Sequence, residues 1–200
     1  SVWEDIGERY LADHKIAVRG NLRNALRTMS LEQGAAWLKE EYQLKKSIPQ
    51  IIEEVLKIVS NFYRFEAPLK SGVKETLEWL KERNVKMVIA TSGNRKLAEA
   101  ALERNGIRDY FEQIYTCTEV GAGKDEPLIY LKAAEFMQAE PKDTVVFEDA
   151  LHAAETAKQA GFVVIGVYDE ENRANIFRMK EVCDCYCDTM DAAIDWMKSK

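Results

Sequence analysis

The chain has 200 residues, of which 46% are hydrophobic and 31% charged, with only 4 Pro and 10 Gly. These values are typical of one globular domain, or of one domain with an insertion, and they exclude a collagen-like, disordered or low-complexity chain. The formal net charge of −6 and the lack of a basic cluster argue against a nucleic-acid partner. No apolar run approaches the roughly 18 residues of a membrane-spanning helix, and no secretion signal is visible.

The four cysteines favour free thiols over disulfides or zinc. Cys117 stands alone, and Cys183, Cys185 and Cys187 alternate along a short segment. Cysteines at this spacing are badly placed to form disulfides with one another, and the spacing does not match the usual C-x₂₋₄-C zinc pattern. We therefore expect a cytoplasmic protein with reduced thiols. We expect it to be a monomer or weak dimer that binds neither membrane nor nucleic acid.

Residues 1–66 are expected to form a small helical unit. Apolar residues such as Ile6 and Tyr10 recur at helical spacing near the start of the chain. Ser30 is typical of a helix N-terminus, and Pro49 opens a further segment with an apolar stripe.

From residue 67 to 200 the pattern changes to short apolar runs that alternate with amphipathic helices. This alternation predicts an α/β domain, in which helices cover both faces of a parallel sheet. The expected strands are residues 85–90, 113–116, 144–147, 162–167 and, as an edge strand, 185–187.

Polar residues follow three of these strands at their carboxyl ends, where open parallel sheets bind ligands. They are Thr91, Ser92, Gly93 and Asn94, then Lys124, then Glu148 and Asp149. Each of these residues could instead have an ordinary structural role. Hydroxyl side chains often cap helices, lysines are common on the surface, and carboxylates are favoured at helix N-termini. Together they fit a phosphoryl group, bound by hydroxyl, amide and ammonium groups, beside Mg²⁺ bound by carboxylates.

At these positions the sequence resembles the haloacid dehalogenase superfamily, in its β-phosphoglucomutase-like branch of phosphatases and mutases. Residues 88–92 (VIATS) match a strand that ends in Thr or Ser, and residues 123–127 (GKDEP) match the lysine motif G-K-P-x-P. Residues 145–150 (VVFEDA) match the strand that ends in E-D-S. The likeness covers residues 67–190, and residues 1–66 fit the helical cap that this branch inserts.

The resemblance implies a Rossmann-like core and an aspartyl-phosphate mechanism. Thr91 would bind the transferred phosphoryl group with the Ser92 backbone N–H, and Lys124 would offset its charge. Asp149 would bind Mg²⁺, supported by Glu148. The substrate would be a small phosphorylated metabolite, with sugar phosphates as one candidate.

The sequence departs from the family pattern at several positions. Asp125 stands for Pro, Leu128 for Asp, Ala150 for Ser and Ala153 for Gly. The first motif, D-x-D-G-T, is absent. The resemblance implies that the nucleophile, and the central strand that carries it, precede residue 1, so these 200 residues alone should be inactive. Without that strand, two buried strands would each keep an unpaired edge.

Four alternatives to this hypothesis differ in how well they fit the motifs. A sugar phosphate mutase would share every motif, and a phosphate-binding pseudoenzyme would lack turnover; both stay open. A response-regulator receiver is disfavoured because its acidic pair precedes its Thr and Lys in the chain. A P-loop is rejected because Thr118 and Asp125 do not match G-x₄-G-K-[ST].

Overall fold

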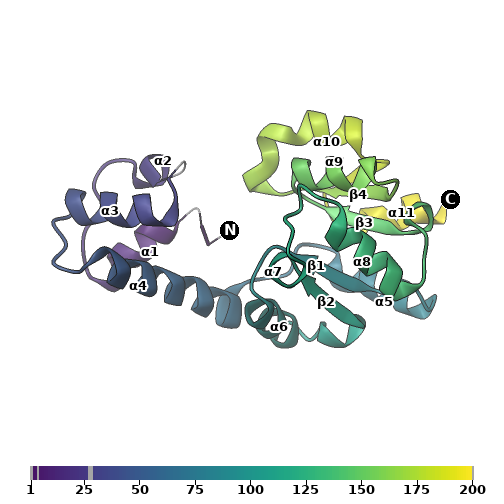
Figure 1. The fold of residues 1–200 in the computed structure, drawn as a ribbon, viewed down its shortest axis with the longest axis horizontal. Coiled ribbons are helices and arrows are strands. Elements are labelled where there is room, and N and C mark those ends of the chain that lie inside the picture. The colour runs from purple at the N-terminus through teal and green to yellow at the C-terminus, as the bar shows by residue number, and fades with distance from the viewer. Residues whose placement is uncertain (1, 4, 27–28, 200) are drawn as a thin grey trace. The chain divides into compact units, whose positions relative to one another are not determined.

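A computed structural model describes residues 2–3, 5–26 and 29–199, which form two compact units, 1–67 and 68–200 (Figure 1). None of the described helices is both long and apolar enough to cross a membrane. Each unit has its own hydrophobic core.

The first unit is helical, as its apolar spacing predicts. Its helices are α1 (Ile6–Asp13), α2 (Leu22–Leu26), α3 (Leu31–Glu41) and α4 (Ile48–Asn61), followed by the π-helical turn η1 (Phe62–Glu66). Ser30 and Ser47 each form a capping box at the start of α3 and α4, which supplies acceptors to otherwise unpaired N–H groups. The core of this unit is built around Tyr10, Leu11 and Ile51.

The described part of the second unit has five short parallel strands. They are β1 (Val88–Thr91), β2 (Gln113–Thr116), β3 (Val145–Glu148), β4 (Val163–Val167) and β5 (Cys185–Cys187). The α-helices are α5 (Val73–Glu82), α6 (Arg95–Arg104), α7 (Cys117–Val120), α8 (Leu128–Met137), α9 (Leu151–Gln159), α10 (Ile176–Val182) and α11 (Ala192–Lys198). The 3₁₀ turns are η2 (Arg108–Tyr110), η3 (Pro141–Asp143) and η4 (Glu170–Asn175).

The expected single sheet is divided into two. Among the described strands, β1 pairs only with β2, and β3, β4 and β5 form a second sheet in that order. Register places Thr91 opposite Thr116, and Glu148 opposite Gly166. The α/β class and the parallel direction are therefore as predicted, whereas no described strand joins β1 to β3.

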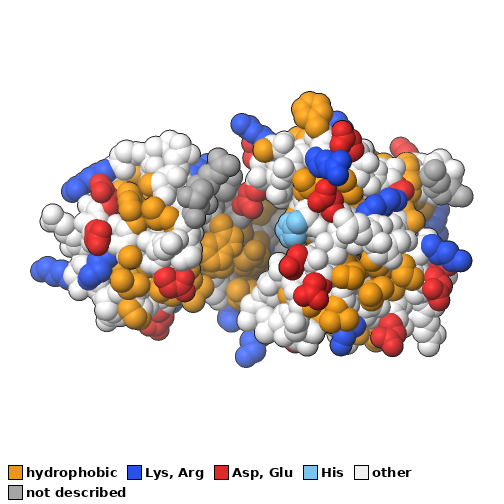
Figure 2. Space-filling view, turned by 45° about the horizontal axis from the view of Figure 1, so that its top comes forward, with side chains coloured by type: hydrophobic (Ala, Val, Ile, Leu, Met, Phe, Trp, Pro, Cys, Tyr) orange, Lys and Arg blue, Asp and Glu red, His pale blue; other side chains and the backbone are white. Residues whose placement is uncertain are grey.

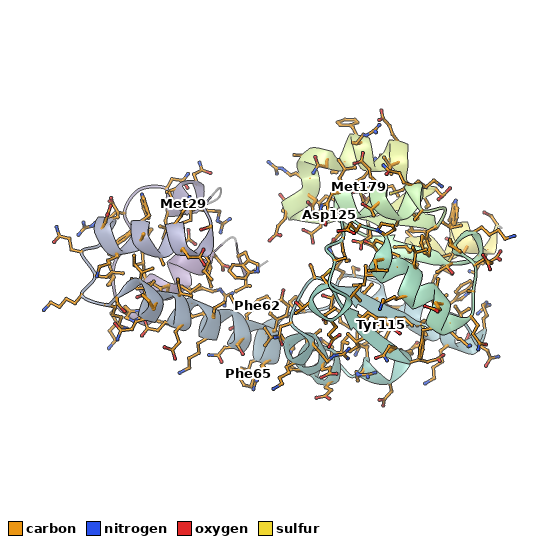
Figure 3. All side chains as sticks on the ribbon, viewed as in Figure 1. Met29, Phe62, Phe65, Tyr115, Asp125 and Met179 are labelled. Carbon is orange, nitrogen blue, oxygen red and sulfur yellow. The ribbon has the colours of Figure 1, made fainter. Side chains whose placement is uncertain are left out.

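Helices cover both sheets. α8 contacts β1 and β2, α9 contacts β3 and β4, and α11 contacts β5 (Figure 1). The larger core lies under α8, α9 and α10 and includes Ile129, Phe162 and Val164. Figure 3 labels Tyr115 on β2 and Met179 on α10, which both belong to this packing.

Candidate active site

The loop after β1 is organised by short-range hydrogen bonds. The Gly93 N–H donates to Thr91 Oγ1 at 3.0 Å, so the hydroxyl is held as an acceptor within its own turn. The Asn94 side chain accepts from the N–H groups of Lys96 and Leu97 and caps α6. Asn94 thus performs the capping role that the sequence left open for Thr91 and Ser92, while Ser92 and Gly93 are exposed.

Lys124 and Glu148 form the most buried ion pair of the described site. Their side chains are 16% and 5% exposed, and Lys124 Nζ donates to Glu148 Oε1. Tyr130, on α8, donates its hydroxyl to the same oxygen at 2.8 Å. Burial, and then the negative charge of Glu148, raise the pKa of the Tyr130 phenol well above its usual value. Tyr130 therefore stays a neutral donor.

Asp149 contacts a different cation. Its Oδ2 lies 3.3 Å from Lys70 Nζ, which also pairs with Asp169 and donates to the Tyr168 carbonyl at 3.0 Å. Lys70 precedes α5, and it links the segment that follows β3 to the segment that follows β4. Both Lys70 and Asp149 are more than a third exposed, so this pair is screened by solvent.

The structure thus brings together only part of the predicted set. Lys124 meets Glu148, whereas no hydrogen bond or ion pair within the described residues joins either of them to the loop of residues 91–94. Asp125, labelled in Figure 3, lies beside Lys124 in the loop between α7 and α8. A Cβ at Gly123 would lie 2.3 Å from Asp125 Oδ1, and because Asp125 is exposed its side chain could rotate to make room for it.

Sequence reasoning missed Tyr130 and Lys70. Tyr130 shares its helix with apolar residues, so its spacing indicated only core packing. Lys70 lies in the segment PLKSGV, which belongs to the family resemblance but has no assigned role there.

The carboxylates of Glu148 and Asp149 are ligands of the type that Mg²⁺ prefers, but they are too few to hold the ion alone. This ion prefers oxygen ligands in near-octahedral geometry, which Glu148 and Asp149 can supply in part. No three acidic, His or Cys side chains lie close enough to hold a metal ion in the part of the chain that the structure describes. Both carboxylates also face ammonium groups. An ion here needs further ligands.

The surface carries no dominant cationic region on the face shown in Figure 2. Its described lysines and arginines are scattered among acidic and hydrophobic side chains. A small anion would therefore be bound by placed donors at the strand ends rather than by a broad positive field.

These features define a class: an α/β protein whose parallel strands carry hydroxyl, ammonium and carboxylate groups at their carboxyl ends. The family model of haloacid dehalogenase-like hydrolases matches residues 3–161, so the chain belongs to this family. Its relatives lie in the β-phosphoglucomutase-like branch.

Two curated relatives and one crystal structure illustrate the likeness. The phosphorylated carbohydrates phosphatase of Thermotoga maritima is 33% identical over 133 residues, which are 64% of this chain and 60% of that protein. The β-phosphoglucomutase of Bacillus subtilis is 34% identical over 99 residues, 50% of this chain and 43% of that protein. The chain therefore spans less than two thirds of the length of these relatives.

The fold comparison extends further along the chain. A Thermotoga maritima protein described as a candidate β-phosphoglucomutase has a TM-score of 0.81 at 24% identity. The match covers 99% of this chain and 91% of that one. At this identity the likeness establishes the fold alone, and it agrees with a Rossmann-like core.

Proposed function

We propose that the protein is a phosphatase acting on a small phosphorylated metabolite, a sugar phosphate being the leading candidate. The observation that carries this proposal is the buried Lys124–Glu148 pair at the carboxyl end of β3. An ammonium has three donors, so Lys124 can keep its bond to Glu148 and still donate to a phosphoryl oxygen. Glu148 and Tyr130 then act as positioning residues that hold the ammonium in place.

Thr91 is proposed to bind the phosphoryl group. Its hydroxyl oxygen accepts from Gly93, which leaves its proton available for donation to a phosphoryl oxygen. The Ser92 N–H would add a second donor in the same loop. Fixed donors of this kind stabilise the charge that develops during phosphoryl transfer.

The metal and the nucleophile are further parts of the proposal. Asp149 would hold Mg²⁺ with support from Glu148, and the bound ion would offset phosphoryl charge. The attacking group would be an aspartate that none of the 200 residues supplies, and the product of attack an aspartyl-phosphate. We propose that residues 1–66 serve as a cap that selects the substrate.

Turnover of p-nitrophenyl phosphate with Mg²⁺ tests this function. We expect no turnover by residues 1–200, and turnover by a form extended at its N-terminus with an apolar strand and a D-x-D motif. Lys124→Met in the extended form should lower kcat/KM by at least about 100-fold, the scale of losing a charge-stabilising donor. An inactive extended form that is folded and binds phosphate would instead support a pseudoenzyme.

A sugar phosphate mutase is the second candidate, favoured by the likeness to the Bacillus β-phosphoglucomutase. Hydrolysis and mutase activity differ in their products. With a hexose 1-phosphate as substrate, release of inorganic phosphate supports the phosphatase. Conversion into the 6-phosphate without phosphate release supports the mutase.

A further inference from the structure

Cys185 and Cys187 lie on one face of β5 with their thiols close together. Their Sγ atoms are 3.4 Å apart. Both are free cysteines, of which Cys187 is buried and Cys185 is half-buried. Residues two apart in a strand point to the same face of the sheet, so the proximity follows from the strand itself. The two residues therefore form a dithiol that is reached from solvent at Cys185, and the proposed phosphatase chemistry uses neither of them.

The surroundings of this dithiol are apolar and well packed. Cys187 belongs to a cluster with Ile165 of β4 and Ala193 of α11, and Cys185 and Met197 pack against the same cluster. β4 pairs with β5 along one edge, and α11 contacts β5. Strand pairing and helix packing together hold the two sulfurs at their spacing.

The third cysteine of this segment is not part of the pair. A Cβ at Gly166 of β4 would lie 2.9 Å from Cys183 Sγ, so this thiol lies against Gly166. Gly166 and Ile165 are neighbours on one strand and face opposite sides of the sheet. Cys183 also packs against the larger core and not against the cluster of Cys187. It is therefore separated from the dithiol by the sheet.

The spacing of the sulfurs suits a shared ion better than a disulfide. A disulfide needs an S–S distance of about 2.05 Å and Cβ atoms about 3.5–4.5 Å apart. Alternate residues of an extended strand lie about 6.6 Å apart, so closing the bond would distort β5. Two thiolates bound to one ion at about 2.3 Å have sulfurs about 3.8–4.6 Å apart, for bond angles from tetrahedral to linear. Chelation thus moves the sulfurs apart, toward the spacing of the strand.

The available ligands select a soft ion with a low coordination number. Thiolates and thioethers favour Cu(I), whereas structural zinc takes four ligands. Across residues 2–3, 5–26 and 29–199, no three Cys, His, Asp or Glu side chains are placed to share a metal ion, so zinc would lack ligands at the dithiol. Two thiolates suffice for Cu(I), and the Met197 thioether in the same packing offers a third soft ligand.

We propose that Cys185 and Cys187 form a Cu(I)-binding site, in which both thiolates bind one ion on the face of β5 that packs against α11. Each thiol releases its proton to the buffer as its sulfur binds, and the copper keeps its oxidation state. Burial, and then the contact with Cys185, raise the pKa of Cys187 to about 12, so this thiol keeps its proton while the site is empty. The proposal does not depend on the proposed catalytic activity.

Competition with a coloured Cu(I) chelator tests the site. The reduced 200-residue chain is titrated, without oxygen, into the complex of Cu(I) with bicinchoninate, and the loss of absorbance is followed. We expect each chain to withdraw one equivalent of Cu(I). X-ray absorption at the copper edge of the loaded chain should then show sulfur ligands alone.

Substitutions of single cysteines provide matched variants. Cys185→Ser and Cys187→Ala should each lower the affinity for Cu(I) by at least about 100-fold, because loss of a ligand exceeds the 10–100-fold effect of losing an outer-shell partner. Cys117→Ser and Cys183→Ala remove a thiol elsewhere in the second unit and should leave the affinity unchanged.

Three results would overturn the proposal. Unchanged affinity in Cys185→Ser and Cys187→Ala, or an equal loss in Cys117→Ser and Cys183→Ala, would place the ion elsewhere. Nitrogen or oxygen ligands in the absorption spectrum would exclude a dithiol site, and this measurement on the unaltered chain stays valid even if a variant does not fold. One ion for every two chains would show a site that two copies share.

Discussion

Glu148 is the residue at which burial and charge conflict most. It ends an apolar strand and is 5% exposed, so an unpaired carboxylate there would be strongly disfavoured. Lys124 and Tyr130 resolve the conflict by donating to the same oxygen. The pair is therefore a structural requirement of this sheet edge as well as a candidate phosphate site.

Removing the cation should destabilise the second unit. Lys124→Ala leaves Glu148 buried with only Tyr130 as a partner. Breaking a buried ion pair costs about 3–5 kcal/mol, and because Lys124 is partly exposed we expect about 2–4 kcal/mol. Urea denaturation measures this loss.

The exposed Lys132→Ala on α8 serves as the control and should change the free energy of unfolding by less than about 0.5 kcal/mol. Adding Glu148→Gln to Lys124→Ala should recover part of the loss, because the buried charge is gone. Equal effects of Lys124→Ala and Lys132→Ala would contradict this account of the pair.

Two thiols near β5 should react slowly. Burial raises the pKa of Cys183 to about 11 and that of Cys187 to about 12. Because the thiolate is the nucleophile, alkylation by iodoacetamide at pH 8 should be at least about tenfold slower at both than in the urea-unfolded chain. Mass spectrometry of the labelled peptides measures both rates, and rates equal to those in urea would contradict the predicted burial.

At the scale of elements, an ion pair between Arg95 and Glu119 links α6 to α7. Arg95 on α6 donates from Nη2 to Glu119 on the four-residue helix α7 at 2.7 Å. Glu119 also completes a capping box with Thr116 at the end of β2. A helix this short has little intrinsic stability, so these side-chain contacts hold it beside the strand end.

The link predicts a loss of stability in acid. The hydrogen bond from Arg95, and then those within the Thr116 capping box, lower the pKa of Glu119 from 4.5 to about 2. A carboxyl with a lowered folded-state pKa stabilises the fold above pH 4.5, and this contribution is lost as pH falls from 4.5 toward 2. Glu119→Gln should remove that part of the pH dependence, as followed by thermal unfolding between pH 5 and 2. Glu126→Gln, at an exposed position, should retain it.

At the scale of the whole molecule, the two units have separate cores. Ile51 in the first unit and Ile165 in the second are both fully buried, and they belong to different clusters. The residues of each cluster come from one unit only. Loss of packing in one core should therefore first lower the local stability of the unit that contains it.

A crossed pair of substitutions checks this expectation. Ile51→Ala and Ile165→Ala should each cost about 2–4 kcal/mol, the range for truncating a buried isoleucine. Hydrogen exchange should accelerate in residues 1–67 for the first variant and in residues 68–200 for the second. Acceleration of both units by either substitution would contradict separate cores.

Much of the fold followed from local patterns. The strands at 113–116 and 185–187 lie where the sequence predicts them, since short apolar or alternating runs bounded by turns define them. β1, however, spans Val88–Thr91 and not the predicted 85–90, because the strand is defined by its pairing with the four residues of β2. The residues of a strand do not by themselves specify how many of them will pair with a neighbouring strand.

The sequence alone established the α/β class, the order of the elements and the chemical groups at the strand ends, because periodicity and turn residues act over a few neighbours. Packing between distant segments decided the rest. It paired Lys124 with Glu148 and Tyr130, and Lys70 with Asp149. Such contacts depend on the relative placement of helices and strands, which no local pattern specifies.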